Sequence, residues 1–312
     1  MNTLKVPILI IAFNRLDCVQ RVFESVRQYQ PTQLFLAADG PRQDRPTDAP
    51  KCQEVRDWLM QRVDWECDVQ TRFLTENVGC GYGPSSAISW FFEHVEEGVI
   101  LEDDCVPTLQ FYQYAAEMLE RYRDNPEIMA VNSCNFQTKP WGDGSYYFSM
   151  QNGPFCAWAT WRRAWLHFEF TLKDLNEKIV LRDMRYYDAS KWERKWWTEV
   201  FRNFKNGVYG TSSWDYQFIF AIWHQHGMTI VPNVNLSTNI GFGEDATHTT
   251  NVNARIAFRP TGNIYPLSHP SEIRYCRDAD LAYHNFYYRQ WQDDTPWWKK
   301  LKRKIKSIIK RQ

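Results

Sequence analysis

The sequence lacks paired cysteines, and it lacks the cysteine and histidine spacing that a structural zinc site needs. Its eight cysteines lie at positions 18, 52, 67, 80, 105, 134, 156 and 276, and none of them forms a C-x-x-C pair. Scattered cysteines in a chain of 312 residues without a secretory signal are typical of a reduced, cytosolic protein.

The chain also lacks a long hydrophobic run and a net charge. The apolar stretch Val6–Phe13 contains Pro7 and is much shorter than the roughly 20 residues of a membrane-spanning helix. The 37 Lys and Arg residues balance the 37 Asp and Glu residues, which argues against a general nucleic-acid-binding protein. Hydrophobic residues make up 44% of the chain, so we expect a substantial core.

The zero net charge hides a basic C-terminal segment. Trp297–Gln312 contains eight Lys or Arg residues and no acid, so 29 basic residues remain against 37 acidic ones in the rest of the chain. Apolar residues at 297, 298, 301, 305, 308 and 309 fall on one face of a helix, and basic residues cover the other. This pattern predicts an amphipathic helix, over 291–312, that lies on an anionic membrane surface. A solvated tail and a nucleic-acid contact are the alternatives.

Strand-like and helix-like segments alternate along the first third of the chain. Apolar runs typical of buried strands lie at 6–13, 34–38, 69–74 and 99–101, and helical patterns lie at 16–26, 53–63, 84–95 and 109–123. This alternation predicts an α/β fold, with a mostly parallel sheet between layers of helices. Further along, Trp158, Trp161 and Trp165 have a spacing that we interpret as a core-facing helix, and we expect another helix over 214–226.

Polar residues follow three of the predicted strands. They are Asn14-Arg15, Asp39-Gly40 and the acidic triplet Glu102-Asp103-Asp104. Ligands of parallel sheets bind beyond the carboxyl ends of the strands, so we expect these three segments to converge.

The acidic triplet comes directly after a buried strand, where adjacent carboxylates repel one another. Either their pKa values shift or a cation neutralises them. Carboxylate oxygens suit Mg²⁺ or Mn²⁺, which complete their coordination with water and substrate phosphates. An exposed acidic loop before the helix near Thr108 is the alternative, but the position of the triplet favours a metal and phosphate site.

The segments "IIAFNR", "AADGPR", "VILEDDC" and "SSWDYQF" together resemble the GT-A glycosyltransferases. The resemblance is closest to the branch typified by N-acetylglucosaminyltransferase I, which has a Glu-Asp-Asp form of the Asp-x-Asp (DXD) motif. It is clearest over residues 6–135 and patchy as far as about residue 250. It implies a GT-A-like, mostly parallel sheet, a nucleotide-sugar-binding half at 1–135 and an aromatic-rich, acceptor-binding half at 136–290 of the same domain.

The resemblance also implies roles for the residues at the first two strand ends. Asn14 and Arg15 match the position where the family holds the nucleotide and its diphosphate, and the planar guanidinium of arginine suits phosphate oxygens. Asp39 matches an acid that contacts uracil. A turn-forming role before Gly40 is an equal alternative for Asp39.

For the acidic triplet, the resemblance implies that Glu102 lies near the donor sugar. It implies that Asp103 faces the ribose and that Asp104 binds the metal.

Inverting transfer needs one general base, and Asp215 matches the catalytic aspartate of this branch. An acid in the first turn of a helix, where the helix dipole favours it, is the alternative for Asp215. The sequence also departs from the family pattern here, since Tyr216 follows where relatives carry a second acid. Glu244 or Asp245 in the glycine-rich loop are alternative bases. His248 matches the late histidine that many GT-A enzymes bring to the metal.

These observations together predict a metal-dependent, inverting glycosyltransferase of polysaccharide biosynthesis. Its donor would be a UDP-sugar, and its acceptor a saccharide or a lipid-linked saccharide. The enzyme would be cytoplasmic and peripheral on the inner face of the cytoplasmic membrane. One competing hypothesis is a nucleotidyltransferase that makes nucleotide sugars, although "AFNRLD" lacks the glycine-rich loop of such enzymes. Another is a non-catalytic protein that binds carbohydrate or membrane.

Overall fold

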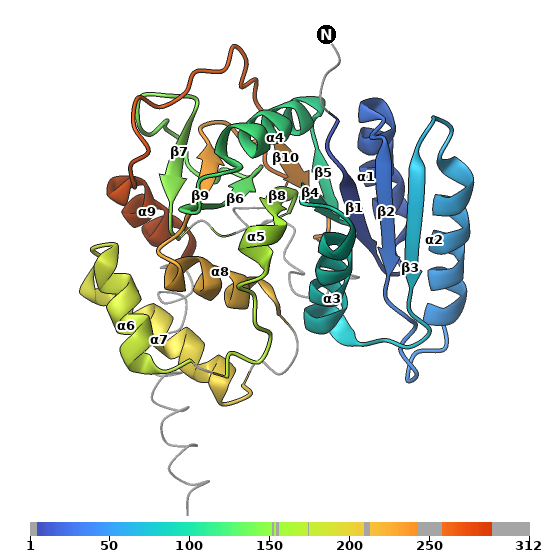
Figure 1. Cartoon of the computed structure of the whole chain (residues 1–312). Coiled ribbons are helices and arrows are strands. Elements are labelled where there is room, and N and C mark those ends of the chain that lie inside the picture. The colour runs from blue at the N-terminus through green and yellow to red at the C-terminus, as the bar shows by residue number, and fades with distance from the viewer. Residues whose placement is uncertain are drawn as a thin grey trace, which may run out of the picture.

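The computed structural model describes residues 5–151, 153, 156–173, 175–208, 213–242 and 258–288. Within these residues one sheet has eight strands in the order β3-β2-β1-β4-β8-β6-β9-β7 (Figure 1). Its strands are β1 (Ile8–Ala12), β2 (Gln33–Ala38), β3 (Asp68–Phe73), β4 (Glu97–Glu102), β6 (Ile128–Asn132), β7 (Tyr146–Ser149), β8 (Trp158–Trp161) and β9 (Met228–Pro232).

The sheet is mostly parallel. β1 lies between β2 and β4, β2 also pairs with β3, and all of these pairings are parallel. β8 is antiparallel to both β4 and β6, so β6 and β9 run in the direction of β4, whereas β7 at the edge is antiparallel to β9. The sequences of β1 and β6 are almost entirely buried, as expected of strands that are covered on both faces. The mixed α/β architecture predicted from the sequence is therefore confirmed.

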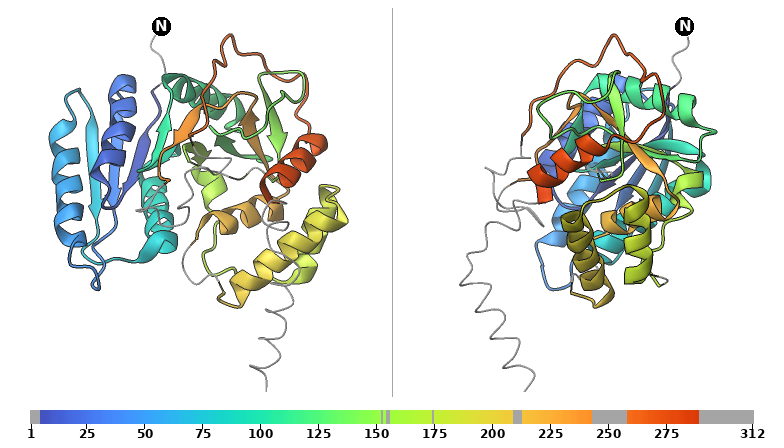
Figure 2. Two further views of the ribbon diagram at one scale, coloured as in Figure 1. Left: turned by 180° about the vertical axis from the view of Figure 1, so that it is seen from behind. Right: turned by 90° about the vertical axis from the view of Figure 1, so that its left-hand side faces the viewer.

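Four helices follow the strands of the first half. They are α1 (Leu16–Tyr29), α2 (Asp48–Arg62), α3 (Gly79–His94) and α4 (Leu109–Tyr122). α1 and α2 pack side by side on one face of the first strands, and α3 covers the opposite face (Figures 1 and 2). α1 buries Val19, Val22 and Val26, which recur at helical spacing. The order β3-β2-β1-β4 places the loops after β1 and β4 at the same edge of the sheet.

The second half adds further helices around β7, β8 and β9. They are α5 (Arg162–Trp165), α6 (Glu177–Tyr186), α7 (Lys191–Lys205), α8 (Asp215–His224), α9 (Arg277–Tyr283) and a π-helical turn over His284–Tyr288. α7 begins with a capping box, because the side chain of Ser190 accepts from the backbone of Glu193 and the Glu193 side chain accepts in return. The same buried Glu193 pairs with Arg277, so α9 is tied to the start of α7.

The tryptophan segment differs from the prediction. Trp158 and Trp161 lie in strand β8 rather than in a helix, and only the residues from Arg162 to Trp165 are helical. Because β8 is paired on both edges and covered on both faces, all four of its residues are buried. A fully buried strand and a buried helix both have continuous apolar sequences, so the spacing could not separate them. The expectation that these tryptophans belong to the core is correct.

A small second sheet brings a late part of the chain to the acidic triplet. β5 (Cys105–Pro107) pairs antiparallel with β10 (Ser237–Asn239), with Asn239 opposite Cys105. The backbone N–H of Ile240 then donates to the carbonyl of Asp104 at 2.8 Å. The residues after β9 are thereby fixed beside the end of β4.

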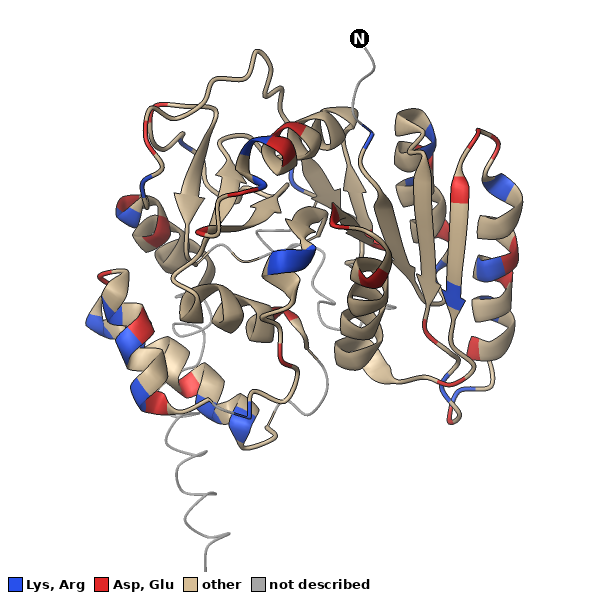
Figure 3. Cartoon of the chain, viewed as in Figure 1, with Lys and Arg blue, Asp and Glu red and all other residues tan. Residues whose placement is uncertain are grey.

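Charged residues lie mainly on the outer helices. Basic and acidic residues are interspersed along α2, α6 and α7, whereas strands β1, β2, β6 and β9 contain none (Figure 3). Among the helices of the described ranges, none combines the length and the apolar character that crossing a membrane requires. The predicted basic helix over 291–312 lies outside the described residues.

Candidate functional site

The acidic triplet lies where β4 gives way to β5. Glu102 is the last residue of β4, and Asp103 and Asp104 form the turn that leads to Cys105. In the β1–β4 pairing Glu102 lies beside Ile11, so the loop after β1 starts next to the triplet. The structure thus brings these two predicted strand ends together. The third, the end of β2, lies beside the end of β1, since Ala38 pairs with Ala12.

Arg15 provides the contact between the ends of β1 and β4. Its Nη2 donates to Asp104 Oδ2 at 2.9 Å and forms a still closer ion pair with Asp103. Burial alone would lower the pKa of Arg15, but attraction by Asp103 and Asp104 raises it above its ordinary value. A protein cation therefore neutralises part of the acidic cluster, which the sequence analysis left to a metal ion or to shifted pKa values.

Raised pKa values reduce the negative charge of the acidic cluster further. Removal from water raises the pKa of Glu102 to about 8, and repulsion by Asp104, Asp215 and Asp103 adds to the effect. Removal from water also raises the pKa of Asp103 to about 6, although Arg15 opposes the rise. Glu102 is therefore largely protonated at neutral pH as long as no further cation is bound.

Asp215 is close enough to Glu102 to contribute to that shift, although 113 positions separate the two residues in the sequence. It is the first residue of α8, and the hydroxyl of Ser213 donates to its carboxylate. The structure thus places the predicted base on the same side of the sheet edge as the acidic triplet. Its predicted role as a base is not tested by this position.

The donor atoms around the triplet fit a divalent cation. Ligand atoms of Glu102, Asp104 and Cys105 all lie within 4.8 Å of one another. Asp103 is 6% exposed, and its buried Oδ2 has no hydrogen-bond partner among the described residues. An orphaned buried carboxylate oxygen is costly unless a cation or a ligand donor occupies the adjacent space. The residues present therefore suit the metal that the sequence analysis predicts.

Sequence reasoning missed two residues at this site. Burial raises the pKa of the Cys105 thiol, which donates to Asp104 Oδ1 at 3.1 Å. Gly241 lies against the other side of Asp104, since a Cβ at position 241 would come within 1.9 Å of Asp104 Oδ2. Adjacency to the triplet could have identified Cys105, but the proximity of Gly241 depends on the pairing of β5 with β10.

Asn14 and Asp39, the other predicted nucleotide contacts, are held by the protein itself. Asn14 donates to Asp48 at 2.9 Å, at the start of α2. The carboxylate of Asp39 accepts from the backbone of Gly40, Val78 and Gly79 at 2.8, 3.0 and 3.1 Å. Removal from water raises the pKa of Asp39, and these hydrogen bonds oppose the rise. The geometry supports the turn-forming interpretation of Asp39, and its contact with uracil stays a prediction.

The remaining candidates, Glu244, Asp245 and His248, lie outside the described residues. Their predicted roles as alternative bases and as a metal ligand are not tested by the geometry of the acidic cluster.

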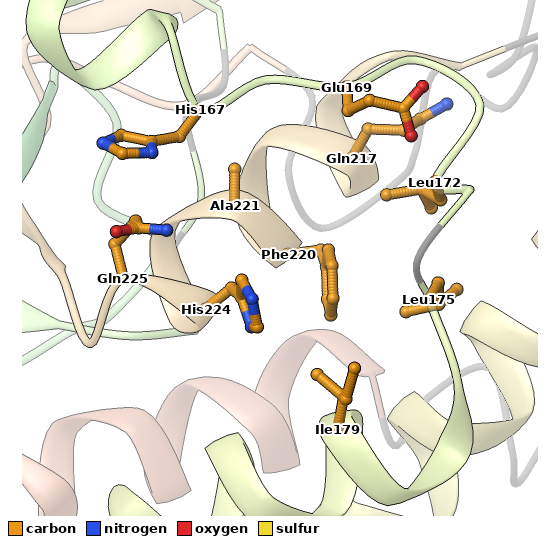
Figure 4. Close-up of a pocket in the computed structure, with 10 residues that line it drawn as sticks. All are labelled: His167, Glu169, Leu172, Leu175, Ile179, Gln217, Phe220, Ala221, His224 and Gln225. Carbon is orange, nitrogen blue, oxygen red and sulfur yellow. The ribbon is translucent and has the colours of Figure 1, made fainter.

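A cavity of about 140 Å³ lies elsewhere, between α6, α8 and the segment 167–175. Figure 4 shows His167 and Gln225 on the left, Glu169, Leu172 and Leu175 on the right, and Phe220 between them. His224 also lines it and pairs with the buried Asp183 at 3.0 Å. None of the predicted site residues that the structure describes lines this cavity, although Asp215 begins the helix that borders it.

No family model matches the chain, and no curated protein matches it in sequence. HddC from Yersinia pseudotuberculosis aligns with 51% of this chain and 78% of its own, at 10% identity and a TM-score of 0.31. TarS residues 1–349 from S. aureus align over 52% of this chain and 48% of that one, at 12% identity and a TM-score of 0.35. A 4-diphosphocytidyl-2C-methyl-D-erythritol synthase from Anaerococcus prevotii covers 60% and 78%, at 9% identity and a TM-score of 0.31. These scores are too low to carry an argument about function.

Proposed function

We propose that this protein is a metal-dependent glycosyltransferase that moves a sugar from a UDP-sugar to a saccharide or lipid-linked acceptor, with inversion. One observation supports the proposal most strongly. Arg15 and the triplet Glu102-Asp103-Asp104 meet at the carboxyl edge of a mostly parallel sheet, which is where ligands of such sheets bind. A guanidinium beside carboxylates suits a ligand that carries both a diphosphate and a divalent cation.

The roles of the residues follow from their contacts. Asp104 would hold the cation together with Glu102, and Arg15 would donate some of its guanidinium N–H groups to the diphosphate. A Mn²⁺ or Mg²⁺ ion at this place would stabilise the negative charge that develops on the leaving diphosphate. Asp103 is the more buried of the two turn acids and would hold the ribose.

Asp215 is our candidate for the general base. It would take the proton of the acceptor hydroxyl as that oxygen attacks the anomeric carbon. Its carboxylate accepts from the Ser213 hydroxyl, which fixes its orientation at the start of α8. Its proximity to Glu102 supports an acceptor position on the side of the triplet that faces α8.

The acceptor and the location of the enzyme are inferred from the sequence of the tail. Eight basic residues and Trp297-Trp298 over 297–312 suit an anionic membrane surface. We propose that the enzyme works at the inner face of the cytoplasmic membrane on a surface glycan. A lipid-linked saccharide would be present at that surface.

A donor panel tests the proposal. Purified protein is incubated with several UDP-, GDP- and CDP-sugars, in Mn²⁺ or in EDTA, and release of the nucleoside diphosphate is measured. We expect release from one UDP-sugar in Mn²⁺ and none in EDTA. A parallel incubation with nucleoside triphosphates and sugar 1-phosphates measures pyrophosphate. Pyrophosphate release without diphosphate release would replace the proposal with the nucleotidyltransferase hypothesis, and nucleotide binding without either product would favour a non-catalytic protein.

A further inference from the structure

Three thiols lie behind the acidic triplet, each from a different part of the chain, and two of them, Cys105 and Cys134, are buried. Cys105 begins β5, Cys134 follows β6, and Cys156 precedes β8. The side-chain amide of Asn239 lies 3.7 Å from the sulfur of Cys105 and 3.8 Å from that of Cys156. Among the described residues, Cys105 is the one of these three cysteines whose sulfur lies close enough to carboxylate oxygens of Glu102 and Asp104 to share a metal ion with them.

Cys105 already interacts with the carboxylate that the proposed function assigns to the metal. Its thiol donates to Asp104 Oδ1 at 3.1 Å, while Arg15 donates to the other oxygen, Oδ2. Ligands at metal distances of about 2.0–2.3 Å lie roughly 3.5 Å apart in a tetrahedral site. Because the three ligand atoms lie within 4.8 Å of one another, metal binding requires a side-chain adjustment of at most about 1 Å.

We infer that Cys105 is a direct metal ligand, together with Glu102 and Asp104. The mixed oxygen and sulfur set selects borderline or soft divalent cations, such as Zn²⁺, Co²⁺ and Cd²⁺, over Mg²⁺. A thiolate is a soft ligand, whereas Mg²⁺ takes oxygen ligands almost exclusively. On binding, the metal–sulfur bond replaces the S–H bond, and the proton leaves to the buffer. No change in oxidation state is involved.

Two buried atoms of the cluster, the sulfur of Cys105 and one oxygen of Asp103, add to the case for a cation at this place. Cys105 is 0% exposed, so its sulfur does not face bulk water. The buried Oδ2 of Asp103 lacks a hydrogen-bond partner among the described residues. The inference rests on the proposed function only in placing a cation at Asp104. It adds Cys105 as a further ligand of that cation and gives the site a preference for borderline or soft metals.

Cys134 provides the matched control. It is as buried as Cys105, at 2% exposure, but its sulfur lies 3.2 Å from the hydroxyl of Ser237 and is not one of the three ligand atoms that could share a metal ion. Cys105→Ser and Cys134→Ser each replace one buried sulfur by one oxygen. A general effect of losing a buried thiol would therefore appear in both variants.

The test is a titration of the reduced full-length protein with Co²⁺, followed by absorption spectroscopy. A cobalt–thiolate bond gives a charge-transfer band in the near ultraviolet, which oxygen ligands do not give. We expect the band in the wild type and in Cys134→Ser, and its loss in Cys105→Ser. We also expect the ratio of Cd²⁺ to Mg²⁺ affinity to fall at least about tenfold in Cys105→Ser. A wild-type protein that binds Co²⁺ without the band, or a Cys105→Ser variant that keeps it, would overturn the inference.

Two further measurements keep the result interpretable. Cadmium NMR of the wild-type protein reports sulfur ligation through its chemical shift, so it decides the question even if Cys105→Ser does not fold. Binding of UDP in Mn²⁺ and in EDTA is measured on the same preparation. If UDP binding depends on Mn²⁺ while the cobalt and cadmium spectra show oxygen ligands alone, the inference fails and the proposed function stands. If no divalent cation binds, both fail.

Discussion

At the scale of single residues, Arg15 determines how the acidic cluster is neutralised without a metal. It pairs with two carboxylates that lie 88 and 89 positions away in the sequence, and Glu102 gives up its charge through a raised pKa. If the site binds the proposed divalent cation and diphosphate, both effects should disappear, because the cation would attract the carboxylates and the diphosphate would attract Arg15. Ligand binding and protonation would therefore be coupled at this site.

The raised pKa of Glu102 predicts a pH dependence of stability. Its pKa is about 8 in the folded protein and 4.5 ordinarily, so the native state holds a proton that the unfolded state releases in this range. In EDTA, the free energy of unfolding should therefore decrease from about pH 5 to pH 8, by on the order of 2–4 kcal/mol. Glu102→Gln should remove most of this decrease, leaving a smaller slope from Asp103.

Urea denaturation at several pH values measures this effect. Glu54→Gln, a substitution of an exposed glutamate on α2, is the control and should follow the wild type. Parallel pH profiles for the wild type and Glu102→Gln would contradict the assigned protonation of Glu102.

The proposed base leads to a second prediction at this scale. Asp215→Ala should leave the dissociation constant of UDP unchanged within about twofold and lower the rate of transfer at least about 100-fold, because only the proton acceptor is lost. Transfer to acceptor is measured with the donor found in the panel, and UDP binding is measured by calorimetry. Transfer at the normal rate would show that the base is a different residue, with Glu244 and Asp245 as the next candidates.

At the scale of elements, the side chain of Asp39 holds the start of α3 against the end of β2. It accepts three backbone hydrogen bonds and a fourth from Asn77 Nδ2 at 2.9 Å. Asp39→Ala should lower the free energy of unfolding by about 1–2 kcal/mol, since four donors, three of them in partly buried hydrogen bonds, lose their acceptor. Urea denaturation measures this loss. A variant as stable as the wild type would contradict the capping role.

Individual elements show what the sequence could predict. β1 and α1 were predictable because each has one strong apolar pattern, continuous in the strand and spaced by three or four residues in the helix. β8 was not, because a strand buried on every side has no periodicity. The pairing of β5 with β10 joins two three-residue strands, which are too short to leave a pattern. The contact of Gly241 with Asp104 could not be foreseen for the same reason, because it depends on that pairing. Cys105 could have been identified by its adjacency to Asp104, although the direction of its side chain could not.

At the scale of the whole molecule, one sheet connects the two halves of the chain. β8 of the second half pairs with β4 of the first, and α8 of the second half places Asp215 near Glu102. The buried Asp280 of α9 accepts from the backbone of Met150 at 2.9 Å, which fixes α9 against the end of β7. The candidate site is thus built from both halves, and the sequence analysis could predict its triplet but not the contacts across the halves.

Membrane association is the prediction that belongs to this scale. The full chain should float with liposomes that contain anionic lipid, and a variant ending at Asp294 should not, since each basic residue near such a surface contributes about 1 kcal/mol. Neutral liposomes serve as the control, and neither protein should float with them. A shortened variant that floats as well as the full chain would remove the basis for a membrane-bound acceptor.

The most direct test of the central claim is the dissociation constant of UDP measured by calorimetry in Mn²⁺ and in EDTA, for the wild type and for Asp104→Asn. If a cation shared by Asp104 and the diphosphate holds the nucleotide, the wild type should bind UDP at least about tenfold more tightly in Mn²⁺, and Asp104→Asn should show no difference. Equal affinities of the wild type in Mn²⁺ and in EDTA would contradict the account.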